Sequence, residues 1–401
     1  MTQNPTVSVV IVSHGRPALL RRALIGVSQL FYRPFEVVVI ADQVGLDAIA
    51  DLPFCDRIKT GLQAAANISA ARNQGVDLAA GEIVAFFDDD AVPEPTWLNH
   101  LTAPFSDPDV MAATGTVLGR NGISVQWGGR SVDAQGVAYP VSGPVPAAHA
   151  VKLEGTNMAI RRSALALIGG FDPGFSFFLD ETDLAWRLKT NGMLAEFAPM
   201  ATVHHGYAES LRRSAARVPK SLFQIGASSA IYLRKHSDPA AIEARLRDLM
   251  REQSDRVQGF VRKGDIAVDE MHRLLKDLQA GIAAGRLATL APPHAVAVPP
   301  EFRPLPVNAP PEPLTLAGRW FQRRSLLQKA EVAAAKGRSC SLFLLAPTIR
   351  AHRVFFSNSG VWVQSGGLFG PSLRSQRRFT YHRFAARITA ERARLAGIRW
   401  I

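Results

Sequence analysis

Three adjacent carboxylates, Asp88, Asp89 and Asp90, follow directly after the apolar run 82–87 (EIVAFF). Adjacent carboxylates repel one another, and at the mouth of a buried strand this repulsion is tolerable only where a cation or several donors offset it. Carboxylate oxygens suit Mg²⁺ or Mn²⁺, which fill the rest of their coordination shell with water and substrate phosphate. The run therefore indicates a divalent-metal site. An acidic turn that caps a helix near Pro95 is the alternative.

Further polar side chains stand at the ends of neighbouring predicted elements. Arg72 and Asn73 lie early in the second predicted helix, where a guanidinium can form bidentate hydrogen bonds to a diphosphate or to a base edge. Ser13 and Arg16 lie where the first strand leads into the first helix, next to backbone N–H groups that can bind an anion. Asp42 follows the second strand and can accept from a base N–H group. Together these residues predict a nucleotide site.

Alternating strands and helices must position these residues. Apolar, β-rich runs at 7–12, 36–40 and 82–87 alternate with helical spacing at 16–30 and 67–80. Consecutive apolar residues are typical of strands that are buried on both faces of a parallel sheet. Such sheets bind ligands at the carboxyl ends of their strands, where the polar residues described above are found. We therefore expect an α/β fold with a Rossmann-like, mostly parallel sheet, flanking helices, and a helical and basic C-terminal extension.

Eight motifs follow one another between residues 6 and 206: VSVVIVSHGRP, EVVVIAD, SAARNQG, GEIVAFFDDDAVP, EGTNMAIRRSAL, GGFDPGF, DETDLAWRLKTNG and a closing HH. In order and spacing they resemble a family 2 glycosyltransferase of the GT-A fold, an inverting enzyme that uses nucleotide sugars. The resemblance covers half of the chain. It implies that Ser13, Arg16 and Asp42 surround the base and ribose of the donor, and that Arg72 contacts the nucleotide.

The same resemblance implies the metal ligands and the cofactor. Asp88, Asp89 and Asp90 would bind the ribose and the metal, with Asp90 as a direct ligand. A neutral imidazole can complete the shell of Mn²⁺ or Mg²⁺, and the family histidine that follows Pro199 by a few residues corresponds to His205. A divalent metal, Mn²⁺ or Mg²⁺, is the expected cofactor.

A second acidic group, Asp180, Glu181 and Asp183, opens another predicted helix. An inverting transfer needs a carboxylate that takes the proton of the acceptor hydroxyl while its oxygen attacks the anomeric carbon opposite the leaving diphosphate. In the family pattern Glu-Asp-x-Asp-Leu the second acid is the base, which corresponds to Glu181. If Glu181 points away, Asp180 or Asp183 takes this role. Three acids that only stabilise the start of a helix are the alternative.

Two departures from the family pattern concern the nucleotide. The family usually has two adjacent acids after the second strand, where this chain has Ala41-Asp42, and Thr-Tyr-Asn where it has Ser13-His14-Gly15. A uridine diphosphate sugar is the favoured donor, and thymidine or guanosine diphosphate sugars are the alternatives. A glycan or a lipid-linked molecule is the expected acceptor.

Charge divides the chain into two halves. The whole chain has a net charge of +12, yet residues 1–206 hold 14 basic and 20 acidic side chains, whereas residues 207–401 hold 32 and 14. The basic half predicts contact with an anionic membrane surface or an acidic acceptor. Nucleic acid is not favoured, because no binding motif accompanies the basic and aromatic residues. Two cysteines, the lack of a signal-peptide pattern and the lack of a membrane span indicate a cytoplasmic protein, peripheral at the inner face of the membrane.

Four segments are expected along the chain. Residues 1–236 would form the glycosyltransferase domain, although residues 110–150 are rich in glycine, valine and serine and indicate irregular turns. Residues 237–291 predict a helical hairpin, with one helix capped by Asp238 and a second from about residue 269 to 287. Prolines occupy 9 of the 22 residues of 292–313, which indicates an extended linker or a wrapping segment. Residues 314–401 form a basic region with a β-rich run at 352–370.

Other functions have less support in the sequence. A binding module for nucleotide sugars or carbohydrates would leave both acidic groups without a role. A sugar nucleotidyltransferase would share the nucleotide and metal sites but needs no base at Glu181. A dinucleotide oxidoreductase is disfavoured because the first turn, SHGRP, lacks a GxGxxG pattern. A processive synthase is disfavoured because the chain lacks membrane spans and a Gln-x-x-Arg-Trp motif.

Overall fold

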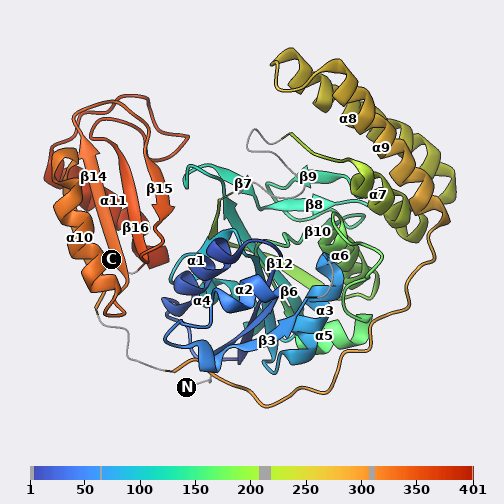
Figure 1. Ribbon diagram of the computed structural model, residues 1–401, viewed down its shortest axis with the longest axis horizontal. Coiled ribbons are helices and arrows are strands. Elements are labelled where there is room, and N and C mark those ends of the chain that lie inside the picture. Colours follow the sequence, from blue (N-terminus) through green and yellow to red (C-terminus); the bar gives the residue numbers. More distant parts are fainter. Residues whose placement is uncertain (1–3, 64–65, 207–217, 307–311, 400) are drawn as a thin grey trace.

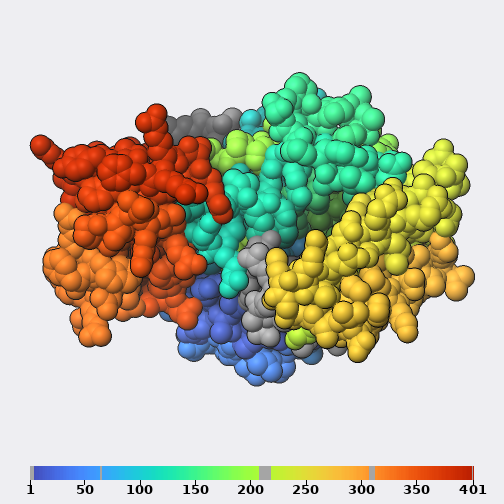
Figure 2. All heavy atoms as spheres, turned by 90° about the horizontal axis from the view of Figure 1, so that it is seen from above, coloured from blue at the N-terminus to red at the C-terminus, as the bar shows by residue number. Residues whose placement is uncertain are grey.

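The computed structural model describes residues 4–63, 66–206, 218–306, 312–399 and 401. An N-terminal α/β domain lies in the middle of the molecule, with a helical arm on one side and a smaller C-terminal α/β domain on the other (Figure 1). Figure 2 shows the same arrangement from above, with the C-terminal domain in orange and red and the arm in yellow. The α/β fold class expected from the sequence is confirmed.

The main sheet carries the residues that the sequence singles out. Its strands follow the order β3-β2-β1-β4-β11-β6-β12-β5, and β7 pairs with β6. Strands β1 to β4 are parallel where they pair, and the register sets Val12 beside Asp88 and Ser13 beside Ala41, so their carboxyl ends meet at one edge. The strands are β1 (Val7–Ser13), β2 (Phe35–Ala41), β3 (Lys59–Leu62), β4 (Ile83–Asp88), β5 (Ala91–Pro93), β6 (Val110–Leu118), β7 (Val125–Trp127), β11 (Met158–Arg161) and β12 (Leu194–His205).

The first three helices of this domain begin where the sequence supplies a side-chain cap or a proline. Pro17 opens the first helix, whose apolar face, including Leu20 and Leu24, is buried on the sheet. The side chains of Asp42 and Asn67 accept backbone N–H groups at the starts of the next two helices, α2 and α3. The helices are α1 (Pro17–Ser28), α2 (Gln43–Asp47), α3 (Ile68–Leu78), α4 (Trp97–Leu101), α5 (Arg162–Ile168) and α6 (Asp180–Thr190).

Residues 110–150 differ from the expectation of irregular turns. They contain the long strand β6, which lies inside the main sheet between β11 and β12. They also form most of a small three-stranded sheet, made of β8 (Arg130–Val132), β9 (Ala138–Pro140) and β10 (Ala150–Val151). The sequence VMAATGTVL of β6 gave no strand signal, because Thr114, Gly115 and Thr116 interrupt its apolar run and the residues do not alternate.

The helical arm consists of α7 (Phe223–His236), α8 (Pro239–Arg262) and α9 (Val268–Leu287). The two helices predicted within 237–291 are confirmed, and the side chain of Asp238 caps α8 as expected. Gly281 lets α7 and α9 approach closely, since a Cβ atom there would lie 2.0 Å from the carbonyl oxygen of Phe223. Within the described residues, none of the helices is long and apolar enough to cross a membrane.

The described part of the proline-rich segment, up to residue 306, binds along the N-terminal domain. His294 lies 3.0 Å from Asp77, and the backbone N–H of Arg303 donates to the buried carboxylate of Glu36 over 2.8 Å. The N–H of Leu305 then donates to the carbonyl of Phe35 over 3.0 Å. The segment is therefore attached to the surface that it crosses.

The C-terminal domain is a second α/β unit. Its sheet has the order β13-β14-β16-β15, in which the first three strands are parallel and β15 is antiparallel to β16. The β-rich run predicted at 352–370 contains β15 and β16. The sequence analysis predicted neither β13 nor β14. The elements are β13 (Leu314–Arg319), α10 (Arg323–Ala334), β14 (Cys340–Ala346), β15 (Arg353–Phe356), β16 (Val361–Gly367) and α11 (Phe384–Arg399).

The end of α11 is docked into the N-terminal domain through a buried ion pair. Arg399 donates to both oxygens of Glu94 over 2.6 and 2.7 Å, and both side chains are only 1% exposed. The guanidinium also lies 4.3 Å from the ring centre of Trp362 in β16. Burial by itself would raise the pKa of Glu94, but Arg399 and His204 outweigh burial and lower that pKa to about 2.

Replacing Arg399 should therefore destabilise the whole chain. An Arg399→Ala variant leaves the buried Glu94 carboxylate without its main partner, which typically costs about 3–5 kcal/mol. We expect a lower midpoint in urea unfolding than for Arg392→Ala, which changes an exposed arginine of the same helix. Because the pKa of Glu94 is lowered on folding, the difference between the variants should be complete above about pH 4.5 and shrink as the pH falls toward 2. Equal midpoints for the two variants would contradict this account.

Candidate active site

The predicted metal ligands come together at the carboxyl edge of the main sheet. Ligand atoms of Asp88, Asp90 and His205 all lie within 4.8 Å of one another, and His205 Nε2 lies 3.0 Å from Asp90 Oδ1. The other ring nitrogen of His205 faces Gln126 Oε1 at 3.2 Å, so the ring is held from behind. Two carboxylates and an imidazole fit a divalent cation such as Mn²⁺ or Mg²⁺.

Asp89, the middle acid of the run, faces the first strand and helix. It accepts from Ser13 Oγ over 2.7 Å and from Arg16 Nη1 over 2.8 Å. Burial raises the pKa of Asp89 to about 7, with Arg16 opposing the shift and Asp90 adding to it. Ser13, Arg16 and Asp89 thus lie together, as the sequence predicted, and they tie the start of α1 to the end of β4.

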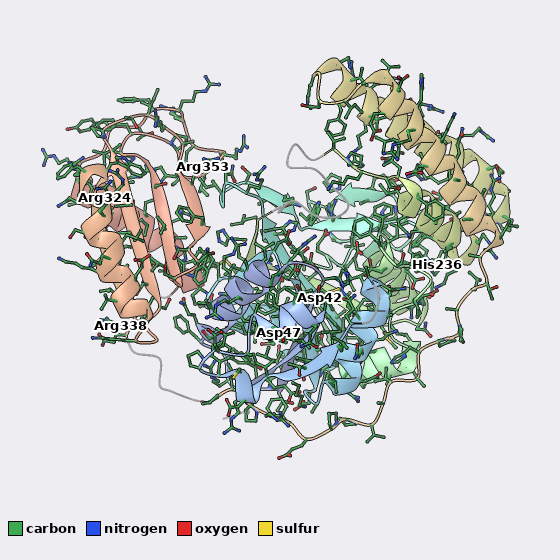
Figure 3. All side chains as sticks on the ribbon, in the orientation of Figure 1. Asp42, Asp47, His236, Arg324, Arg338 and Arg353 are labelled. Atoms are coloured by element: carbon green, nitrogen blue, oxygen red, sulfur yellow. The ribbon has the colours of Figure 1, made fainter. Side chains whose placement is uncertain are left out.

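Asp42 lies at the end of β2, near the middle of the N-terminal domain in Figure 3. Its carboxylate accepts from the backbone N–H of Gly15 over 2.7 Å and from that of Gly45 over 3.0 Å. Gly15 has a φ of +69°, a conformation that glycine adopts without strain. Asp42 therefore fixes the loop after β1 as well as the start of α2.

Arg72 and Asn73 are neighbours with different surroundings. Arg72 is 4% exposed, donates to the carboxylate of Asp180, lies 3.4 Å from Asp88, and donates to the carbonyl of Gly155 over 3.0 Å. It connects the metal-site acids with the acids of α6. Asn73 instead forms two 2.8 Å hydrogen bonds with the backbone of Phe171, away from this group.

The three acids of α6 have three different environments. Asp183 is fully buried and contacts Arg187, Lys235 and His236, so it joins α6 to the helical arm (Figure 3 labels His236). Burial would raise the pKa of Asp183, but these partners, His236 foremost, lower it to about 2.

Asp180 and Glu181 differ in exposure and in charge. Asp180 is buried, and burial raises its pKa, while Arg72 opposes this shift and Glu181 adds to it. The Glu181 side chain is 19% exposed and lies 3.0 Å from Lys152 Nζ. Burial would also raise the pKa of Glu181, but the Lys152 ammonium and the hydrogen bond of Asp180 outweigh burial and lower it. Glu181 is thus a partly buried carboxylate that Lys152 keeps ionised at neutral pH.

The backbone before α6 is strained. Phe178 and Leu179 have φ values of 74° and 65°, in the left-handed region that side chains other than glycine rarely adopt. This pair turns the chain directly into Asp180 and Glu181. The strain coincides with the residues that the sequence singles out for proton transfer.

The sequence analysis missed two residues of the site, Lys152 and Trp127, whereas Thr156 lies in the motif EGTNM that it singled out. Thr156 donates to Asp88 over 2.5 Å, Lys152 pairs with Glu181, and Trp127 lies 5.5 Å from the ring of His205. Lys152 follows the short strand β10 and carries no motif of its own. Thr156 belongs to the motif EGTNM, whose order along the chain was the available signal.

Comparisons with known proteins support one family. The family model described as glycosyl transferase family 2 matches residues 8–169. A pre-mycofactocin glycosyltransferase of Mycobacterium tuberculosis is 30% identical over 178 residues, which cover 43% of this chain and 36% of that protein. An N-acetylglucosaminyl-diphospho-decaprenol L-rhamnosyltransferase of the same organism is 38% identical over 64 residues, 16% of this chain and 21% of that protein.

Among solved structures, residues 1–349 of S. aureus TarS in complex with UDP-GlcNAc are similar at a TM-score of 0.48 and 16% identity, covering 70% of this chain and 81% of that one. The chain spans about a third of the length of the pre-mycofactocin glycosyltransferase that it matches. Residues 8–169 of the N-terminal domain are therefore similar to glycosyl transferase family 2.

Proposed function

We propose that this protein is a metal-dependent, inverting glycosyltransferase that moves a sugar from a nucleotide diphosphate sugar to an acceptor hydroxyl. The observation that carries the proposal is the pairing of two centres at one sheet edge. Asp88, Asp90 and His205 form a cluster suited to a divalent cation, and Arg72 connects Asp88 to the helix that presents Glu181. A binding module would need neither the strained turn before α6 nor a partly buried carboxylate that a lysine keeps ionised.

The donor would be held by the loop and helix that flank the metal cluster. Ser13, Arg16 and Asp42 are assigned to the base and ribose, and Arg72 and Asp88 to the nucleotide end of the diphosphate. A uridine diphosphate sugar is the favoured donor, because such sugars are common in the family that the sequence resembles. Asn73 contributes indirectly, since its hydrogen bonds fix Phe171, over which the Arg72 guanidinium lies at 5.4 Å.

Asp88, Asp90 and His205 would hold the metal, and a bound Mn²⁺ or Mg²⁺ supplies positive charge for the diphosphate that leaves. Glu181 Oε accepts the proton of the acceptor hydroxyl as the hydroxyl oxygen attacks the anomeric carbon. Lys152 keeps this carboxylate ionised before the reaction. Arg72 holds Asp180 and Asp88 in place, so the spacing between the two centres is fixed.

The acceptor is proposed to be a glycan or a lipid-linked molecule at an anionic membrane surface. One relative is named for a diphospho-decaprenol acceptor. The C-terminal domain offers exposed aromatic side chains, Phe321, Phe379 and Tyr381, which are 80%, 57% and 70% exposed. They stand among the arginines of a region with 16 basic and two acidic residues after residue 313. Aromatic and cationic side chains together favour an anionic lipid interface.

Removal of metal should abolish transfer. We expect EDTA to stop turnover and Mn²⁺ or Mg²⁺ to restore it. His205→Ala should raise the Mn²⁺ concentration for half-maximal rate by at least about tenfold, because one of the three ligands is lost. His272→Ala, a change at an exposed position of the helical arm, should leave the metal requirement unaltered. Full activity in EDTA would refute metal dependence.

Loss of the proposed base should remove transfer but not donor binding. Glu181→Gln is expected to lower kcat by roughly 10²–10⁴-fold, the usual contribution of a general base. Calorimetry with UDP and Mn²⁺ should give a Kd within about twofold of the unmodified protein. Undiminished turnover by purified Glu181→Gln would show that Glu181 is not the general base. Nucleotidylation of a sugar phosphate, without any transfer to an acceptor, would favour a nucleotidyltransferase instead.

The pH dependence should respond to Lys152. In Lys152→Met the cation that lowers the pKa of Glu181 is gone while burial remains, so that pKa rises. The ionised base is then lost at a higher pH. We expect the acid limb of the kcat/KM profile to move upward by at least about one pH unit, and Lys152→Arg to bring it back. An acid limb at the same pH in both variants would show that Lys152 does not act on the base.

A further inference from the structure

Helix α7 of the arm contacts the segment 172–183, which contains the strained turn and the start of α6. The helix lies after residues 8–169, which the family model matches, and after the two histidines that close the row of motifs. It has no part in the proposed mechanism. Its contacts with the segment nevertheless lie on both sides of the strained pair, Phe178 and Leu179.

Two hydroxyl groups attach the segment to α7 just before the strained pair. Ser228 Oγ of the helix donates to the carbonyl of Phe177 over 2.8 Å. Ser176 Oγ of the segment donates to Gln224 Oε1 of the helix, also over 2.8 Å. The backbone that enters the strained turn is therefore fixed to α7.

The strained turn also packs on an apolar part of α7. Leu179, which is 8% exposed, forms a buried cluster with Phe175 of the segment and with Ile231 and Tyr232 of the helix. Apolar contacts of this kind favour burial of the side chain but leave the backbone free to choose among several conformations. The polar contacts on either side of the pair have to determine its conformation.

One ammonium group joins the two ends of the segment. Lys235 Nζ lies 2.6 Å from the carboxylate of Asp172 before the strained pair, and 2.6 Å from that of Asp183 after it. Both carboxylates are buried, so solvent screens these contacts little. His236, labelled in Figure 3, adds a 2.8 Å contact with Asp183. A side chain of α7 thus closes the segment 172–183.

These contacts provide what a strained backbone needs. A left-handed conformation costs free energy in residues other than glycine, and it persists where the surrounding structure determines the chain on both sides. The residues of α7 that meet this requirement follow the spacing of a single helix face. They are Ser228, Ile231, Tyr232 and Lys235.

We propose that α7 positions the general base, and that Ser228 and Lys235 are positioning residues which hold the left-handed turn before Glu181. The inference rests on the proposed function, because it concerns how Glu181 meets the acceptor hydroxyl. Without Lys235 the ends of the segment separate, the turn relaxes, and Glu181 leaves the place from which it accepts the proton. The residues assigned to the base and ribose of the donor lie on other elements and keep their places.

A Lys235→Met variant of the full chain tests this proposal. We expect kcat to fall by at least about tenfold, because a displaced base no longer reaches the acceptor hydroxyl. The Kd for UDP with Mn²⁺ should change by less than about threefold. Lys276→Met, at an exposed position of α9, is the matched control and should keep kcat within about twofold of the unmodified chain. Circular dichroism checks that each variant is folded under the assay conditions.

Phe178 allows a rescue of the Lys235→Met variant. Phe178→Gly and Phe178→Ala both remove a ring that is 38% exposed, but only glycine adopts the left-handed conformation without strain. Added to Lys235→Met, Phe178→Gly should therefore give a kcat at least about fivefold above that of Phe178→Ala. Hydrogen–deuterium exchange without substrates gives a second measurement. The amides of residues 176–183 should exchange faster in Lys235→Met than in the unmodified chain.

Three results would overturn the proposal. The first is an unaltered kcat, or an unaltered exchange of residues 176–183, in Lys235→Met. The second is an equal kcat for the two double variants, which would show that strain in the turn does not limit the reaction. The third is a loss of UDP binding as large as the loss of kcat, which would identify a general distortion of the domain. Absence of transfer by the unmodified chain would instead contradict the proposed function, and the exchange of residues 176–183 would still test the role of α7.

Discussion

Arg72 is the contact on which the arrangement of the site depends. Its guanidinium is almost fully buried between Asp88 at the end of β4 and Asp180 at the start of α6, and a third hydrogen bond fixes it to the carbonyl of Gly155. Without it, carboxylates from two distant parts of the chain would face each other in a medium that penalises unpaired charge. Because one planar group satisfies both sides, the metal cluster and the Glu181 carboxylate keep a fixed separation.

The positively charged side chains of residues 207–401 lie in two kinds of surroundings. Part of this charge is used in ion pairs within the protein, where Arg399 pairs with Glu94, and Arg387 and Arg394 pair with Glu391 of the same helix, α11. These arginines hold the C-terminal domain together and against the N-terminal domain. Other arginines of the described residues, such as Arg392, are exposed at the surface. The positive charge that a membrane or an acidic acceptor could contact is therefore smaller than the net charge of residues 207–401.

Sequence reasoning was strongest where chemistry follows a buried strand. Asp88, Asp89 and Asp90 were assignable because an apolar run ends at them, and the sheet register does bring this end beside Ser13. It was weakest where a role depends on distant contacts. Lys152 belongs to no recognisable motif. Its role depends on a 3.0 Å hydrogen bond with Glu181, which lies 29 positions later in the chain. Strand β6 was missed because Thr114, Gly115 and Thr116 interrupt its apolar run, so it shows neither a continuous apolar run nor an alternation.

The two adjacent histidines show why the domains cannot be considered separately. Successive residues of a strand point to opposite sides, so His204 and His205 at the end of β12 serve different partners. His205 turns to Asp90 in the metal cluster, whereas His204 lies 2.6 Å from Glu94 and 4.7 Å from the ring of Trp362. Glu94 in turn holds Arg399 from α11. A shift of the C-terminal domain would move Glu94 and His204, and through the shared backbone it would move His205, which we propose as a metal ligand. The docking of this domain is therefore part of the geometry of the proposed metal site.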